Sequence, residues 1–381
     1  PHAGYVYPGG GQVGTTFKVN VGGQYLRQTQ GVLFSGEGVR ARFVWYLRPA
    51  PNLDGKQRRE LQRQLRVLRG KKLATTPGEQ GGRRGKRANR DKPPEEPVEL
   101  PKSPLLENME GMTLEELKEV ERYFFTRRIP LQRKRAIEET VKIEVTIDPD
   151  AEPGMRDLRV ITKGGLSNPI RFRVGLLPEV RESEPNQPTV PVANALDLPV
   201  VLNGKILPRD VDLFRIKARK GQRLVLRAEA RGLVPYQADS VPGWMQTTLT
   251  LRDARGREVA YADEFRFDPD PVLFYEVPED GTYLVEVRDA VSRGRDDFVY
   301  RVTAGELPFV TRIFPLGGRT GTLTRAQVDG WNLHWRQVPL DTRDAEGRRR
   351  ETAWRQGQAL SLIHISEPTR PNAPSRMPSS A

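Results

Sequence analysis

The sequence has no cysteine and only three histidines among its 381 residues. The missing thiols exclude disulfide bridges and thiolate metal sites, but they do not fix the compartment, because bacterial surface proteins often lack disulfides. His334 lies between two tryptophans in WNLHWRQ, a setting more typical of a turn or an interface than of a general base with a positioned partner. The G-x-S-x-G, H-E-x-x-H and Walker motifs are also missing. We therefore expect no enzyme and assign no catalytic, cofactor-binding or metal-binding residue.

No apolar stretch is long enough to span a membrane, and aromatic residues make up only 7% of the chain. The chain begins at Pro1 without Met, so we expect a cleaved N-terminus or a fragment, with any signal peptide out of view. Glycine (35) and proline (32) are by contrast abundant, and short runs of alternating polar and apolar residues recur. This pattern predicts an all-β fold class of tandem β-sandwiches with many turns.

A glycine motif near the N-terminus has the spacing of a nucleotide-phosphate loop. Gly9, Gly11 and Gly14 spell G-x-G-x-x-G. That motif binds phosphate only when a strand precedes it and a helix follows it. Here only eight residues precede Gly9, and the alternating TTFKVNV that follows predicts a strand. We therefore expect no nucleotide, and we interpret these glycines as a turn into that strand.

An internal repeat offers a better account of the same glycines. Residues 7–26 align without a gap on residues 314–333, with eight identities in twenty positions. Among the matched pairs are Gly11 with Gly318 and Gly23 with Gly330. One structural unit therefore begins twice in this chain.

The first domain is predicted to span residues 1–175 as an immunoglobulin-like sandwich, interrupted by an insert at residues 52–135. Its expected strands are 15–21, 31–34, 39–47, 140–147, 157–162 and 169–174. Residues 74–104, within the insert, are poor in apolar residues and rich in Gly, Pro and charge, so we expect them to be disordered.

Two helices are expected on either side of that segment, forming a helical-hairpin insertion. The first covers residues 56–72 and places Leu61, Leu65 and Leu68 on one face. The second begins at TLEE, where Thr113 and Glu116 fit a capping box, and ends before Pro130. Its apolar stripe consists of Leu114, Leu117, Val120 and Phe124. We expect these stripes to pack together, apart from the sandwich core.

The net charge of +13 belongs mostly to one segment. Residues 56–90 contain thirteen Lys and Arg against two Glu. A charge run of this kind is usually a solvated arm, but it would also attract a polyanion, either nucleic acid or an acidic envelope polymer.

The second half of the chain is predicted to hold a further sandwich and part of a third unit. A Pro-rich linker is expected at residues 176–195, a second sandwich at 196–306, and a truncated repeat of the first unit at 307–359. The eight strands expected in the second sandwich are 198–203, 211–218, 222–230, 246–253, 257–262, 272–277, 282–288 and 297–303. Residues 360–381, with LSLIHISEPTR and SRMPSSA, match the translation of sequencing adapters, so we exclude them from the fold.

Two family resemblances add to this interpretation. The stretches GGGQVGTTFKVNVGGQYL and DPDAEPGMRDLRVITKGGLSNPIRFRV resemble the IPT/TIG domain, an immunoglobulin-like fold. NGKILPRDVDLFRIKARKGQRLVL, LTLRDARGREVAYAD and PEDGTYLVEVRDA resemble the bacterial pre-peptidase C-terminal (PPC) domain. The longer match over residues 178–333 resembles planctomycete surface proteins that set such a domain between IPT/TIG-like units. These resemblances imply a jelly-roll-like second sandwich and an extracytoplasmic, non-catalytic role.

Two groups of residues invite a functional interpretation. The carboxylates are Asp210, Asp212, Asp263, Glu264, Asp268 and Asp270, which could supply oxygen ligands to calcium on facing loops. Ordinary turn chemistry explains the same residues without a metal, and we favour it. Tyr236, Trp244 and Met245 lie in a Pro-containing loop that is typical of an interaction surface, but Trp244 closing one end of the sandwich is the better-supported alternative.

The sequence as a whole predicts a secreted or surface-anchored binding or scaffolding protein of the cell envelope. One alternative is the accessory, non-catalytic region of a larger secreted peptidase or hydrolase. Another is a polyanion or nucleic-acid binder that uses residues 56–90. The expected partner is an envelope polymer or protein, and we expect no cofactor.

Overall fold

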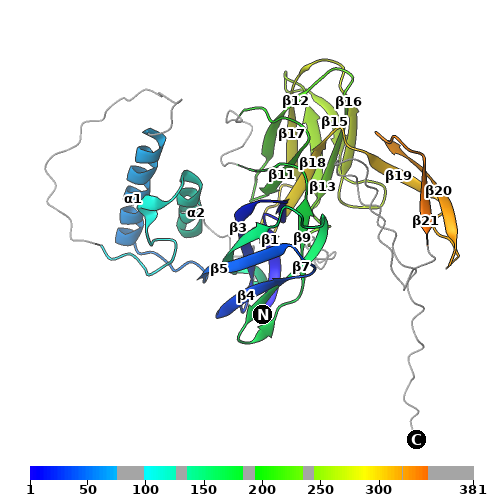
Figure 1. Ribbon diagram of the computed structural model, residues 1–381. Coiled ribbons are helices and arrows are strands. Elements are labelled where there is room, and N and C mark those ends of the chain that lie inside the picture. Colours follow the sequence, from blue (N-terminus) through cyan, green and yellow to red (C-terminus); the bar gives the residue numbers. More distant parts are fainter. Residues whose placement is uncertain (75–97, 126–134, 183–193, 235–243, 320, 342–381) are drawn as a thin grey trace, which may run out of the picture.

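The computed structural model describes residues 1–74, 98–125, 135–182, 194–234, 244–319 and 321–341 (Figure 1). The expected adapter segment and Tyr236 lie outside these ranges. Within them the chain is built mostly of β-strands in several sheets, with the two long helices beside the first sandwich. The predicted all-β fold class is therefore confirmed. No helix in these ranges is long and apolar enough to cross a membrane.

The first sandwich consists of two sheets around a shared core. One sheet has the order β1 (His2–Tyr7), β3 (Thr16–Gln24), β6 (Glu139–Ile147) and β5 (Val39–Leu47). The other has the order β2 (Gly10–Gln12), β9 (Ile170–Gly175), β7 (Gly154–Thr162) and β4 (Thr29–Phe34), with β8 (Gly165–Leu166) beside β7. The alternating residues Val19, Val21, Leu158 and Val160 are fully buried between the sheets, as period-two patterning requires.

The sequence analysis missed β1 and β2 at the N-terminal edge. β1 pairs with β3, and β2 pairs in parallel with β9, so both sheets begin one strand earlier than expected. Gly10 and Gly11 therefore lie in a strand, which corrects their assignment to a turn. Gly14 does occupy the turn, with φ +74°.

The insert forms the expected pair of helices, α1 (Gly55–Ala74) and α2 (Leu114–Phe125), with short 3-10 turns at Met109–Gly111 and Arg135–Ile137. The capping box is present: the Glu116 backbone N–H donates to Thr113 Oγ1 at 3.2 Å, and the Thr113 N–H donates to Glu116 Oε2 at 2.9 Å. The two helices share an apolar cluster that includes Leu61, Leu65, Leu68, Leu117, Val120 and Phe124.

That cluster is separate from the sandwich core, but the insert is not a free arm. Leu47 and Trp45 of β5 join the helical cluster. Leu100, Ser103 and Leu105 also pack there or lie buried, so the expectation of disorder is wrong for residues 98–104. Ala74, the first residue of the segment expected to be disordered, ends α1, and residues 75–97 lie outside the described ranges.

The second sandwich contains all eight expected strands. One sheet has the order β10 (Glu179–Arg181), β11 (Val200–Lys205), β18 (Val299–Gly305), β13 (Arg223–Glu229) and β16 (Val272–Glu276). The other has the order β12 (Asp212–Ala218), β17 (Gly281–Asp289), β14 (Thr247–Arg252) and β15 (Glu258–Ala262).

An unexpected strand, β10, lies in the segment that was predicted to be a linker. It pairs in parallel with β11, so residues 179–181 belong to the second sandwich. Residues 183–193 of that expected linker lie outside the described ranges.

A three-stranded sheet of β19 (Phe309–Phe314), β20 (Leu323–Trp331) and β21 (Gln337–Asp341) follows. Its first hairpin reproduces the start of the first sandwich. A Cβ on Gly23 would lie 2.1 Å from the His2 carbonyl oxygen, and a Cβ on Gly330 would lie 2.0 Å from that of Phe309. Gly14 and Gly321 share a positive φ, as do Tyr25 and Asn332. The repeat seen in the sequence is thus a repeat of backbone geometry.

Candidate functional site

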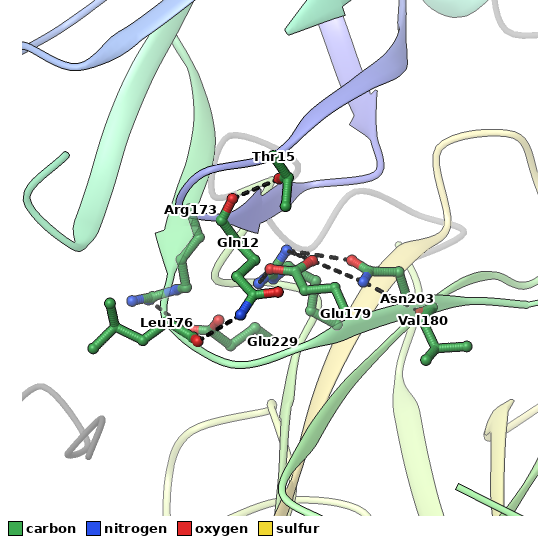
Figure 2. Close-up of polar contacts among 9 residues, drawn as sticks. Gln12, Thr15, Arg173, Leu176, Glu179, Val180, Asn203 and Glu229 are labelled. Carbon is green, nitrogen blue, oxygen red and sulfur yellow. Dashed lines mark hydrogen bonds and ion pairs between the residues drawn. The ribbon is translucent and has the colours of Figure 1, made fainter. Parts of the chain in front are cut away.

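The first two sandwiches meet through a buried ion network, which Figure 2 shows in part. Arg301, on β18, is only 2% exposed, and its Nη1 and Nη2 donate to the two carboxylate oxygens of Glu179 at 2.8 and 2.7 Å. Nδ2 of Asn203, on β11, donates to the same carboxylate at 3.0 Å. A guanidinium that pairs with both oxygens of a carboxylate is fixed in orientation as well as in distance.

The Arg301–Glu179 pair lies within the second sandwich, whereas another ion pair crosses from the first sandwich to the second. Nη2 of Arg173, on β9, donates to Glu229 Oε1, on β13, at 2.5 Å, and both side chains are largely buried (Figure 2). Burial raises the pKa of Glu229, but the positive charges of Arg173, Arg227 and Arg301 outweigh it and lower that pKa to about 2. Glu229 therefore remains ionised at neutral pH inside the junction.

The N-terminal glycines make room for this network. A Cβ on Gly10 would lie 2.4 Å from Nη1 of Arg301 and 2.2 Å from the carbonyl oxygen of Arg173. A Cβ on Gly9 would lie 2.9 Å from a methyl group of Leu233 in the second sandwich. Close approach of the second sandwich, rather than phosphate binding, explains the glycines at positions 9 and 10, whereas Gly11 makes room for the ring of Phe17 in its own sandwich.

A cluster of buried carboxyl groups lies at the same junction. Tyr300 Oη donates to Asp212 at 2.5 Å, and Tyr7 Oη donates to Glu182 at 3.2 Å. Burial, followed by the negative charges of Glu182 and Asp210, raises the pKa of Asp212 well above its usual range. Asp212 therefore acts as a buried hydrogen-bonding group between strands β12 and β18.

The structure does not bring together the carboxylates that were considered as calcium ligands. Asp212 begins β12 and Asp263 follows β15, and these strands are the opposite edges of a four-stranded sheet. Because neighbouring strands lie about 4.8 Å apart, no single ion can contact both. Within the described ranges, no three Asp, Glu, His or Cys side chains form a metal-binding group.

Asp270 acts as a structural anchor in its loop. Its carboxylate accepts hydrogen bonds from the backbone N–H groups of Ala230, Arg231 and Gly232 at 3.1, 2.8 and 2.7 Å. Asp268 in turn accepts from the N–H of Asp270 at 3.0 Å. This is the turn chemistry that the sequence analysis favoured.

Trp244 and Met245 are buried, each only 1% exposed, so they form no interaction surface. Trp244 packs edge-on against Phe298 and its carbonyl oxygen accepts from Arg293, so it belongs to the buried core. His334 is exposed. Nearby, Trp331 stacks between Phe274 of the second sandwich and Phe309, with ring centroids 4.9 and 5.5 Å away. The third unit thus meets the second sandwich through aromatic rings.

The sequence analysis did not single out Arg301, Glu179, Arg173 or Glu229. Two features of the sequence could have pointed to these residues. One is the presence of charged residues inside apolar strands, as in VYRVTAG and IRFRV, and the other is a run of three adjacent glycines that the local sequence does not explain.

No family model matches the chain. Part of it is similar to a probable subtilase-type serine protease of Deinococcus radiodurans, with 33% identity over 100 residues. The match covers 24% of this chain and 13% of the protease, so the chain spans only a small part of that protein's length.

Two solved structures show a distant similarity. One is the SGBP-B protein of the Bacteroides ovatus mixed-linkage glucan utilization locus, in complex with a mixed-linkage heptasaccharide: 8% identity, 80% of this chain and 74% of that chain covered, TM-score 0.19. The other is the C-terminal domain of the Streptococcus pyogenes antigen I/II-family protein AspA: 8% identity, 87% and 94% covered, TM-score 0.16. Scores this low carry no argument about function.

Proposed function

We propose that this chain is a non-catalytic, extracytoplasmic binding or scaffolding protein, built from IPT/TIG-like units at residues 1–175 and 307–359 and a PPC-like sandwich at 196–306. The observation that carries the proposal is the buried ion pair of Arg173, on β9 of the first sandwich, with Glu229, on β13 of the second. A scaffold must hold its modules at a fixed angle. A desolvated, charge-assisted ion pair between two modules does so, because displacing either module would leave a buried charge without its partner.

The second junction supports the same role with different chemistry. Trp331 stacks on Phe274, and Nδ2 of Asn332 donates to the carbonyl oxygens of Arg223 and Leu307 at 2.8 and 3.1 Å. Three consecutive β-units are thus held by specific contacts rather than by open linkers. A surface scaffold requires a fixed spacing between its modules, whereas a diffusible signal carrier does not require one.

The test combines a binding assay and a hydrolysis assay on the purified chain. We expect the protein to sediment with washed bacterial cell envelopes and to leave casein and nitrophenyl esters unhydrolysed. Retention in the supernatant at low salt would overturn the binding role. Hydrolysis above a buffer blank would overturn the non-catalytic assignment.

A second candidate function is the accessory region of a larger secreted peptidase. The similarity to part of the Deinococcus radiodurans subtilase-type protease supports it. Determining the intact reading frame tests this candidate directly. A subtilase catalytic domain in the same frame would favour it over the scaffold.

The partner we propose for the binding role is a polyanion that contacts the basic insert. Residues 56–90 concentrate the net positive charge of the chain, and helix α1 is the part of this segment that the structure describes.

A further inference from the structure

Helix α1 carries a row of cations on the face opposite its apolar stripe. Lys56, Arg59, Arg63 and Arg66 are all exposed, and their spacing of three, four and three residues places them along one side of the helix. Leu61, Leu65 and Leu68 occupy the other side and are buried. Lys56 and Arg66 are ten residues apart in the sequence, or about 15 Å at the rise of an α-helix.

Most other cations of α1 are already engaged. Arg69 pairs with Glu121 of α2, and Arg58 lies over the ring of Phe125. Within the row, Arg63 pairs with Glu60 at 2.6 Å. Among the described residues, neither Arg59 nor Arg66 forms an ion pair with an acidic side chain. These two guanidinium groups are therefore available to an anionic partner.

The helix is held rigidly on the first sandwich. Asp54 accepts hydrogen bonds from the N–H groups of Lys56 and Gln57, both at 2.8 Å, which caps α1. Helix α2, which packs against α1, is fixed to the sheet because Glu119 pairs with buried Lys142 of β6 at 2.6 Å. A preformed row of charges loses less conformational entropy on binding than a flexible arm.

The chemistry of the row distinguishes between classes of polyanion. Helix α1 contains no aromatic residue, so it offers no surface on which nucleic-acid bases could stack. A single straight row also matches one chain of charges better than the two phosphate backbones of a duplex. A guanidinium group donates two parallel hydrogen bonds to the two oxygens of a carboxylate or to two oxygens of a sulfate. We propose that this face of α1 binds a linear acidic polysaccharide, with Arg59 and Arg66 as the principal contacts.

This inference rests on the proposed binding role, and the experiment separates the two. Binding of the full chain to immobilised heparin and to polygalacturonate is measured over a salt series for the wild type and for the double variant Arg59→Gln/Arg66→Gln. We expect affinity to fall about tenfold or more and the slope of log affinity against log salt to fall by about two. The double variant Arg40→Gln/Arg42→Gln removes the same charge from exposed positions of β5 and should change affinity by less than about twofold.

Circular dichroism establishes that each variant is folded. Unchanged polysaccharide binding by Arg59→Gln/Arg66→Gln would overturn the assignment to α1 while leaving the binding role intact. Tighter binding of single-stranded oligothymidine or duplex DNA than of either polysaccharide would overturn the choice of partner. If the wild type sediments with envelopes but binds neither polysaccharide, this inference fails and the proposed function stands.

Discussion

Gly10 of β2 lies directly against the guanidinium of Arg301, although the two residues belong to different sandwiches. A Cβ at position 10 would approach Nη1 to 2.4 Å, a distance that no relaxed contact allows. The glycine-rich N-terminal loop is thus part of the domain junction. Arg301 can occupy the position in which it pairs with Glu179 only because residue 10, far away in the sequence, is a glycine without a side chain.

Gly10→Ala should weaken the junction. The added methyl group must displace both the Arg173 carbonyl oxygen and the Arg301 side chain, so we expect a loss of about 1 to 3 kcal/mol in the free energy of unfolding. Urea denaturation measures it. The repeat supplies the control, because Gly317 occupies the equivalent position and a Cβ there would meet nothing within 4 Å. Equal effects of Gly10→Ala and Gly317→Ala would contradict the close approach.

Breaking the central ion pair should be more costly. Arg301→Met leaves Glu179 without its guanidinium partner in a largely buried setting, so we expect a loss of about 3 to 5 kcal/mol. Arg312→Met removes an exposed pair with Asp329 and should cost less than about 1 kcal/mol. Adding Glu179→Leu to Arg301→Met should recover part of the loss, since no unpaired charge then remains. A double variant no more stable than Arg301→Met would contradict this account.

The ion pair of Arg301 with Glu179 also affects the stability of the second sandwich when it folds alone. Residues 192–306 contain eight of its nine strands but lack β10 and Glu179. We expect the isolated fragment to show a cooperative thermal transition, because its two sheets keep their apolar core. We also expect its melting temperature to lie below that of the intact chain, because Arg301 has lost its partner. Calorimetry of both proteins tests the two expectations.

Local patterns predicted local structure well. Period-two alternation located the eight strands from β11 to β18, and the spacing of Leu61, Leu65 and Leu68 located α1. Both signals depend only on neighbours in the chain. The repeat also predicted that Gly23 and Gly330 share one environment, and in both cases the cause is the close approach of a carbonyl group.

The junction was not predictable in the same way. Glu179 and Arg301 are brought together only by tertiary folding. Arg301 lies in a strand that is buried on both faces, so alternation gives no sign of which side is polar. β10 is only three residues long and lies beside Pro178, in a segment whose composition indicates a linker. Its parallel partner β11 begins about twenty residues later, and such pairings leave little local signal.

Gly23→Val and Gly330→Val should have matching effects if the repeat of geometry is real. In each case the new Cβ would come within about 2 Å of a carbonyl oxygen on the preceding strand, that of His2 or of Phe309. We expect each variant to lose about 1 to 3 kcal/mol of stability, measured by thermal unfolding. Gly31→Val is the control, because a Cβ there would meet nothing within 4 Å. A neutral Gly23→Val would contradict the close approach to His2.

Acid should weaken the junction through Glu229. Its pKa is about 2 in the folded chain against an ordinary value of 4.5, so its ionised form is favoured by folding. Ionised Glu229 contributes roughly 3 kcal/mol to the free energy of unfolding. This contribution is complete above pH 4.5 and is lost as the pH falls toward 2. Asp270 follows the opposite trend, because burial raises its pKa to about 6 and its contribution is lost as the pH rises toward that value.

The two residues are separated by comparing the wild type with Glu229→Gln. Glutamine cannot ionise, so the difference in unfolding free energy between the two proteins should be largest at pH 6 to 8 and should shrink steadily below pH 4.5. The contribution of Asp270 is common to both proteins and cancels. Glu37→Gln, at an exposed turn between β4 and β5, should leave the melting temperature nearly unchanged throughout. A difference between wild type and Glu229→Gln that stays constant from pH 7 to pH 2 would show that Arg173 does not hold an ionised Glu229 in the junction.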